Sequence, residues 1–465
     1  MNIGSRVLIV VFAWTPLMGV TAERQKPLPA ATLTVTPFHA DITPPIGKPI
    51  GMGFVDYAKR IEHPLLAKGL VIRDGGGTYV LCTLDLMEIH NETYDVLREM
   101  IAKAAGTTAG RVALHVLHQH TAPALDETAQ RLQLPKDDPR LIASVEYTRS
   151  IGTKITTAIA SSRGKWQSVE ALGVSQAKVD RVASNRRLRQ SDGTIISRSS
   201  STKDPKLHAA PEGLIDPYLK TVSLLNKERK PLVQIHYYAT HPQSFYRDGR
   251  ISYDVPGIAR EKLQTDSGVF QIYFTGCGGD VAMGKYNDGT LKARTALTKR
   301  LHAAMEKSAG SFKSQPVTTI TWREEMVDLL VRTKPEFLAK QNQEILDNPK
   351  ASFREKLKAG FNLAWVLRQQ RGELVQLSSL TIGDICLVHL CGEPFVQYQL
   401  AAQQMAPGKF VCVAGYGDCA MSYIGGDQSL RDVGGYEQTY AFGGPCEQIF
   451  LKAIGRLLGK TRGTE

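Results

Sequence analysis

Two histidine segments of this chain have the residue types and spacing of a metal site. His118 and His120 flank one residue at the end of an apolar run, and His241 follows a second apolar run directly before Pro242. In an extended segment, side chains two residues apart point to the same side, so both rings of the first segment can reach one cavity. A residue before proline favours an extended backbone. Each motif alone is equally typical of ordinary loop histidines.

A carboxylate and a phenol extend this set further along the chain. Glu393 follows an apolar run and a glycine, and Tyr423 lies in a glycine-rich turn. Glu393 has an alternative role, because acidic residues favour a helix N-terminus, and a tyrosine in a turn more often packs than binds metal. Three N and O ligands with an open position make a catalytic zinc site. Such an ion lowers the pKa of bound water to about 7 and polarises a carbonyl group.

Other chemical signals are weaker or absent. The turn Gly276–Asp280 follows a strand-like run without the Lys of a phosphate loop, so Asp280 either orients a histidine or caps the turn. His115 and His236 lie within apolar runs and are interpreted as structural. No GxSxG segment is present, which disfavours a serine-hydrolase triad.

The apolar patterns predict alternating strands and helices, hence an α/β fold with mixed sheets and flanking helices. Strands are expected at 33–39, 70–73, 79–85, 112–117, 169–179, 221–225, 232–238, 270–274, 374–382, 385–390 and 410–415, and one strand or a strand pair is expected at 317–330. Helices are expected at 91–105, 145–161, 256–264, 291–307 and 445–458. One catalytic domain from 33 to 465 is the simplest division, and the charged, mostly helical stretch 335–371 could be an insertion that covers or flanks the site.

Net charge and cysteine spacing indicate which partners and which cysteine chemistry to expect. The formal net charge of +12 favours contact with anionic partners such as an anionic membrane surface, although a solvated basic surface is the simpler explanation. Nucleic acid is not expected, since no basic tract is interleaved with aromatic residues. Seven cysteines without a CxxC pair predict neither a disulfide framework nor a thiolate zinc site, and leave open one bridge among the last five.

The N-terminus has the pattern of a cleavable signal peptide over 1–22. Arg6 precedes the apolar run 7–20, and small residues precede a cleavage point after Ala22. The run is short for a membrane span, which needs roughly 20 apolar residues. We therefore expect a secreted or periplasmic protein, with an uncleaved N-terminal anchor as the alternative.

Seven motifs, taken in order, resemble those of the neutral/alkaline non-lysosomal ceramidase family. They are 40–44, 118–123, 239–242, 252–257, 276–280, 392–395 and the stretch from Tyr423 to 435–437. The resemblance implies a single large zinc-hydrolase catalytic domain that splits an N-acyl amide bond with zinc-activated water. It implies the zinc ligands His118, His241, Glu393 and Tyr423. It assigns proton handling to His120, and contact with the substrate or transition state to Arg186 and Tyr436.

Three features depart from the family pattern. Arg187 stands where the ceramidases have a serine, Thr121-Ala122-Pro123 replaces Ser-Gly-Pro, and the family's C-terminal β-sandwich domain has no counterpart after Leu458. We predict an exported zinc-dependent amide hydrolase that cleaves ceramide or a related N-acyl lipid. The alternatives are a metal-dependent hydrolase of a different amide or ester, and a non-catalytic binding protein on the same fold. Fe²⁺ or Mn²⁺ would suit the same donors.

Overall fold

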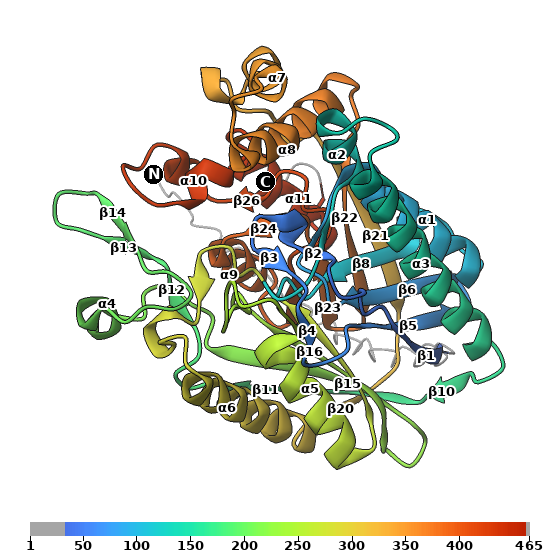
Figure 1. The fold of residues 1–465 in the computed structure, drawn as a ribbon. Helices are drawn as coiled ribbons and strands as arrows, with labels where there is room; N and C mark the ends of the chain where they lie inside the picture. Colours follow the sequence, from blue (N-terminus) through green and yellow to red (C-terminus); the bar gives the residue numbers. More distant parts are fainter. Residues whose placement is uncertain (1–32, 462–465) are drawn as a thin grey trace, which may run out of the picture.

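The computed structural model describes residues 33–461 and contains three larger β-sheets with helices packed around them (Figure 1). Each sheet combines antiparallel strands with one parallel pair. The predicted class, α/β with mixed sheets and flanking helices, is confirmed. The predicted signal peptide lies outside the described residues.

The first sheet has the strand order β10-β1-β5-β6-β8. Its strands are β1 (Leu33–Asp41), β5 (Leu66–Asp74), β6 (Gly77–Leu84), β8 (Val112–Val116) and β10 (Gln167–Val169). Strands β5 and β6 form a hairpin, and β8 runs parallel to β6 because helix α1 (Asn91–Ala105) lies between them in the chain. Helix α1 has the predicted bounds and ends at Gly106, which adopts the left-handed φ of 72° common at a helix C-terminus. Helix α3 (Pro139–Ser162) packs beside α1 and against β1.

The second sheet has the strand order β18-β16-β15-β11-β20. Its strands are β11 (Ala171–Lys178), β15 (Tyr218–Leu225), β16 (Pro231–Tyr238), β18 (Phe270–Thr275) and β20 (Lys313–Pro316). The single strand predicted at 169–179 is divided at Glu170, because β10 pairs in the first sheet and β11 in the second. Helix α5 (Asp254–Ser267) connects the parallel strands β16 and β18, and α6 (Leu291–Gly310) packs on β11 and β15. Helix α5 starts two residues before the predicted Pro256, whose missing N–H is tolerated in a first turn.

The third sheet has the strand order β21-β22-β23-β25. Its strands are β21 (Ile320–Val327), β22 (Val375–Ile382), β23 (Ile385–His389) and β25 (Phe410–Ala414). Helix α9 (Val396–Met405) connects the parallel strands β23 and β25, and α11 (Glu447–Leu457) packs on β21 and β22. The helical stretch predicted at 335–371 consists of a 3-10 turn (Pro335–Phe337), α7 (Ala339–Asp347) and α8 (Phe353–Gln370). Helix α8 packs against α2 (Glu127–Gln133).

Six pairs of short strands lie outside the three larger sheets. They are β7 (Glu88–Ile89) with β9 (Ala124–Leu125), β24 (Glu393–Pro394) with β26 (Tyr423–Ile424), β12 (Ser184–Asn185) with β19 (Val281–Ala282), β13 (Arg187–Arg189) with β14 (Ile195–Ser197), β2 (Pro49–Ile50) with β3 (Asp56–Tyr57), and β4 (Arg60–Ile61) with β17 (Arg250–Ile251). Two short helices, α4 (Pro205–Ala209) and α10 (Glu437–Tyr440), complete the surrounding loops.

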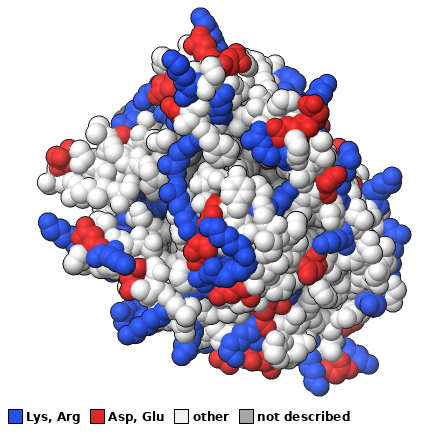
Figure 2. All heavy atoms as spheres, in the orientation of Figure 1, with Lys and Arg blue, Asp and Glu red and all other residues white. Residues whose placement is uncertain are grey.

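One apolar core joins the three sheets. It contains Val35, Leu70 and Leu81 from the first sheet, Leu224, Ile235 and Phe274 from the second, and Leu380, Leu387 and Cys412 from the third. All seven cysteines are buried free thiols, so the bridge left open among the last five is not formed. Within residues 33–461, no helix has the length and apolar content needed to cross a membrane. Basic and acidic side chains are interspersed over the face shown in Figure 2.

Candidate metal centre and active site

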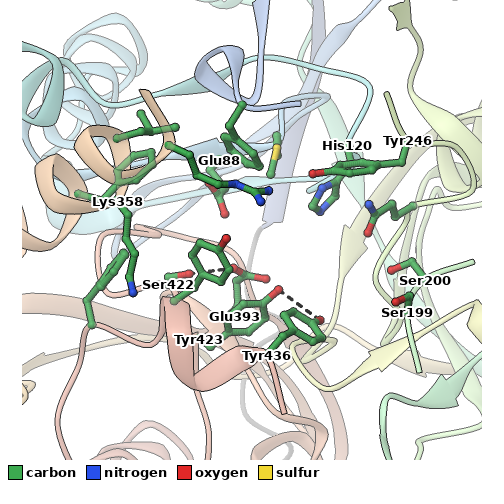
Figure 3. A pocket seen from close by; sticks show the side chains of 18 of the residues that line it. Glu88, His120, Ser199, Ser200, Tyr246, Lys358, Glu393, Ser422, Tyr423 and Tyr436 are labelled. Atoms are coloured by element: carbon green, nitrogen blue, oxygen red, sulfur yellow. Dashed lines mark hydrogen bonds between the residues drawn. The ribbon is translucent and has the colours of Figure 1, made fainter. Parts of the chain in front are cut away.

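The candidate site lies where one parallel strand pair from each sheet ends. His118 follows β8, His241 follows β16 and Glu393 follows β23, so each sheet supplies one residue from the carboxyl end of a strand. A hydrogen bond joins the strand ends of the first and second sheets, because the Thr275 hydroxyl at the end of β18 donates to the carbonyl of Leu117 just after β8 at 2.8 Å. These segments, far apart in the sequence, open into one pocket (Figure 3).

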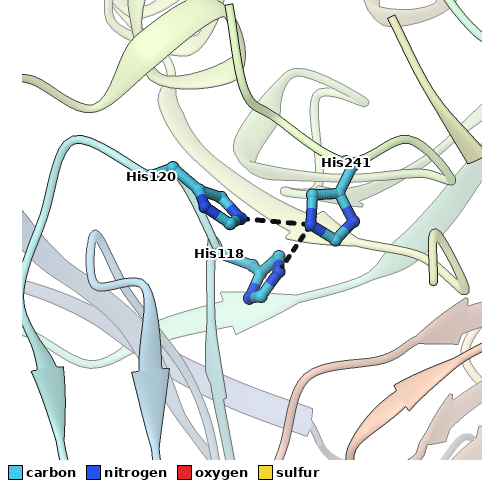
Figure 4. A group of neighbouring side chains, drawn as sticks. All are labelled: His118, His120 and His241. Atoms are coloured by element: carbon cyan, nitrogen blue, oxygen red, sulfur yellow. Dashed lines mark hydrogen bonds between the residues drawn. The ribbon is translucent and has the colours of Figure 1, made fainter. Parts of the chain in front are cut away.

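Three imidazole rings converge at this point (Figure 4). Nε2 of His241 lies 2.9 Å from Nε2 of His118 and 3.1 Å from Nε2 of His120, and all three side chains are buried. The predicted convergence of His118 and His120 is present, although its predicted cause is wrong. His118 has a φ of 68°, so the segment is not extended, and the two rings meet at 87°.

Backbone carbonyls fix the tautomers of two of these rings. Nδ1 of His118 donates to the carbonyl of Met87 at 2.8 Å, and Nδ1 of His241 donates to the carbonyl of Gly278 at 3.2 Å. A neutral imidazole has one N–H, so each Nε2 atom carries a lone pair when its ring is neutral. In that form the two Nε2 atoms, 2.9 Å apart, can both serve as ligands of one cation.

Glu393 supplies a carboxylate oxygen to the same point. Its Oε2 lies 3.1 Å from Nε2 of His118 and 3.7 Å from Nε2 of His241, and it makes no hydrogen bond. Its other oxygen accepts from the Ser422 hydroxyl at 3.1 Å. Ligand atoms around a tetrahedral zinc ion are about 3.4 Å apart, so these separations fit such an ion. Of the two roles considered for Glu393, the helix cap is not observed, because the amide of Val396 that begins α9 donates to Asp280 instead.

Burial and nearby charges shift the pKa values of the three histidines in different directions. Burial lowers the pKa of His118, but the nearby carboxylates of Glu393 and Glu88 outweigh it, so this pKa is raised. For His120 and His241, burial and then the positive charge of His118 hold the pKa well below its ordinary value. His120 and His241 are therefore neutral and available as ligands or proton acceptors near neutral pH.

Tyr423, Tyr436 and Arg186 form one group beside the histidines. Tyr423 pairs with Glu393 across β26 and β24, and its ring is nearly parallel to that of His241, with centroids 6.4 Å apart. Its hydroxyl donates to the Tyr436 oxygen at 3.5 Å, and the Arg186 guanidinium lies 4.1 Å from the centre of the Tyr436 ring. Nε and Nη1 of Arg186 are buried and have no hydrogen-bond partner among residues 33–461, so they can donate to an oxygen in the pocket. The assignment of Tyr423 as a metal ligand remains a prediction.

Glu88 is a member of the site that the sequence interpretation missed. It is buried, and one carboxylate oxygen lies close enough to donors of His118 and Glu393 to share a metal ion with them. Its Oε2 also pairs with Nε2 of His90 at 3.1 Å. The available signal was its position just after β6, which runs parallel to β8 and therefore ends at the same edge of the sheet.

The structure shows the partners of two further residues near the site. Asp280 was considered as a partner for a histidine, but its carboxylate accepts from Asn185 at 2.8 Å and caps α9. Arg187, where the motif resemblance led us to expect a serine, forms buried ion pairs with Asp432 at 2.7 Å and Glu437 at 2.8 Å. It therefore ties the segment that carries Arg186 to the segment that carries Tyr436.

The pocket above this centre has a cavity volume of about 510 Å³, within the usual range for small-molecule sites. Ser199, Ser200, Tyr246 and His120 lie on one side, and Lys358 lies on the other, with Glu393 and Tyr423 between them (Figure 3). Apolar walls complete the lining. They are formed by Phe54, Met87, Leu357, Phe361 and Phe442.

No family model and no curated protein sequence matches the chain. Its fold is similar to that of the neutral ceramidase from Pseudomonas aeruginosa, with a TM-score of 0.65 and 18% identity over 92% of this chain and 75% of that chain. A structure described as ceramidase complexed with C2 is similar with a TM-score of 0.64 and 16% identity over the same shares of the two chains. The chain has the fold of these ceramidases, and the resemblance inferred from its motifs is confirmed at that level.

Proposed function

We propose that this chain, with its neutral-ceramidase fold, is a zinc-dependent hydrolase that cleaves the N-acyl amide bond of ceramide or a related N-acyl lipid. The observation that carries the proposal is the close approach of Nε2 of His118 to Nε2 of His241, with both rings held by backbone carbonyls and with Oε2 of Glu393 beside them. His118, His241 and Glu393 would hold the ion, with Tyr423 as the fourth ligand. When bound, zinc supplies a water of lowered pKa and polarises a carbonyl group.

The remaining residues of the site supply positioning and proton transfer. His120, whose burial favours the neutral ring, would take a proton at Nε2 and return it to the leaving nitrogen. Arg186 and the Tyr436 hydroxyl would donate to the substrate oxygen, where negative charge develops during attack on an amide. The apolar walls would exclude water and hold the acyl chain.

The test combines metal content with turnover of a fluorescent N-acyl sphingosine. Purified protein should contain one zinc per chain and cleave the substrate, and a chelator should abolish cleavage. His118→Ala should lose both zinc and activity, whereas His39→Ala, an exposed histidine on β1, should keep both. Tyr436→Phe should keep zinc and lose about a hundredfold in kcat, the usual effect of removing one oxyanion donor. Wild-type protein without zinc would refute the mechanism.

A different amide or ester is the second candidate, and the loss of the family's serine at Arg187 favours it. Bound zinc without cleavage of N-acyl sphingosine would select this alternative. Export and contact with an anionic membrane surface also remain proposals. Detection of a mature N-terminus at Glu23 by mass spectrometry of the exported protein would support the former.

A further inference from the structure

Helix α8 carries two cations that face the pocket without a carboxylate partner. Arg354 and Lys358 are four residues apart, hence on one face of the helix, and both line the cavity. Neither forms an ion pair within residues 33–461. The acidic residues of the lining, Glu88 and Glu393, belong to the metal centre.

The surroundings of both cations favour an anion. Arg354 is the second residue of α8, where the positive end of the helix dipole opposes a positive charge. The acid next to it, Glu355, is engaged with Ser352 in the capping box. Lys358 is half-buried against the Phe337 ring, 5.7 Å from its centre. Burial lowers the pKa of Lys358, and the nearby Glu336 opposes that effect only in part.

The lining that contains these cations also contains apolar side chains. Leu357 and Phe361 follow the same face of α8, and Phe54 and Phe442 complete the wall. Lys358 lies across the cavity from His120 and Tyr246 (Figure 3). A ligand whose amide lies at the metal centre can therefore contact apolar side chains and two positive charges of the same cavity.

We propose that the pocket selects amides in which an apolar arm ends in an anionic group, a carboxylate or sulfonate, bound by Arg354 and Lys358. The part of this inference that concerns cleavage rests on the proposed amide hydrolysis. The part that concerns binding of the anionic group is independent of that proposal. The cations would accept the anion through charge-assisted hydrogen bonds, which are stronger than neutral ones.

Matched substrate pairs test the selection. The mono-4-nitroanilide of octanedioic acid is compared with the analogue in which an isopropyl group replaces the carboxylate. For the amine arm, N-octanoyl-8-aminooctanoate is compared with N-octanoyl-octylamine. Wild type should prefer the anionic member of at least one pair by about tenfold in kcat/KM. The variant with Arg354→Gln and Lys358→Gln should show a preference below about twofold.

A charge-matched control uses two exposed lysines of the same region. The variant with Lys340→Gln and Lys350→Gln loses the same two charges outside the pocket and should keep the wild-type preference. Equal turnover of both members of both pairs by wild type, or a preference that survives in the pocket variant, would overturn the inference while amide hydrolysis stands.

A binding measurement separates this inference from the proposed function. Decane-1-sulfonate and the neutral decyl methyl sulfone are titrated by calorimetry into chelator-treated protein, so that the probe has no metal to bind. Wild type should bind the sulfonate about tenfold tighter than the sulfone, and the pocket variant should bind both equally. If no amide is cleaved, the proposed function fails, and the binding measurement alone then tests whether the pocket selects an anionic group. Equal affinity for both probes in wild type would overturn the inference.

Discussion

Arg187→Ser, which places the ceramidase residue in this chain, should destabilise the protein and lower turnover without loss of zinc. Nη1 of Arg187 pairs with Glu437 at 2.8 Å and Nη2 with Asp432 at 2.7 Å, and all three side chains are more than 90% buried. Asp432 keeps Arg189 as a partner at 3.0 Å. Glu437 keeps none, because its other oxygen already lacks a hydrogen bond.

The size of the effect follows from this difference. Removing one partner of a buried ion pair costs about 3–5 kcal/mol, and we expect the lower end because only Glu437 loses its sole cation. An unfolding entropy of about 2.1 cal/mol/K per residue gives about 1 kcal/mol/K for this chain, so Tm should fall by about 3 °C. Since Arg187 adjoins Arg186, and Glu437 adjoins Tyr436, kcat should fall by about tenfold or more.

The assay is a double-mutant cycle with Glu437→Gln, read by urea unfolding, kcat and zinc content. The double variant should be more stable than Arg187→Ser alone, because the unpaired buried charge is gone. Arg189→Ser is the matched control. Its ion pair with Asp432 is half exposed, so the loss should stay below about 1 kcal/mol. If Arg187→Ser equals this control in stability, or if Glu437→Gln brings no recovery, the reasoning is refuted.

Three further predictions concern the metal centre and its support. Only His118 among the three histidines has a raised pKa, so zinc affinity should fall as the pH drops through that pKa with a slope of one proton, measured by competition titration; a slope near three would contradict this. In Gly279→Ala, the new Cβ would lie 2.3 Å from the backbone oxygen of Glu393 and displace that residue, so zinc affinity should fall by at least about tenfold. Unchanged affinity in the same titration would show that β24 moves without disturbing the metal centre. Arg260→Met leaves the fully buried Asp85 unpaired and should cost about 3–5 kcal/mol in urea unfolding, whereas a loss below about 1 kcal/mol would show that water reaches Asp85.

Local patterns in the sequence predicted the class of the fold and many of its elements. Helix α1 has the predicted bounds because its apolar spacing, its length and Gly106 all agree. The strand at 169–179 was placed as one element because apolar spacing carries no information on strand partners. Its division at Glu170 results from pairing with β1 on one side and β15 on the other.

The sequence by itself determined which residues follow the strands, and so it gave His118, His120, His241 and Glu393 as candidates. Only the tertiary structure decided that the strands end at one point, that the carbonyls of Met87 and Gly278 select the tautomers, and that Glu88 joins the group. Likewise, the ion pairs of Arg187 and the position of Arg354 and Lys358 in the pocket lining depend on residues distant in the chain. The physical reason is the same in each case. Spacing along a strand or helix fixes local direction, whereas a lone pair, a charge or an empty cavity is defined by what packs against it from elsewhere.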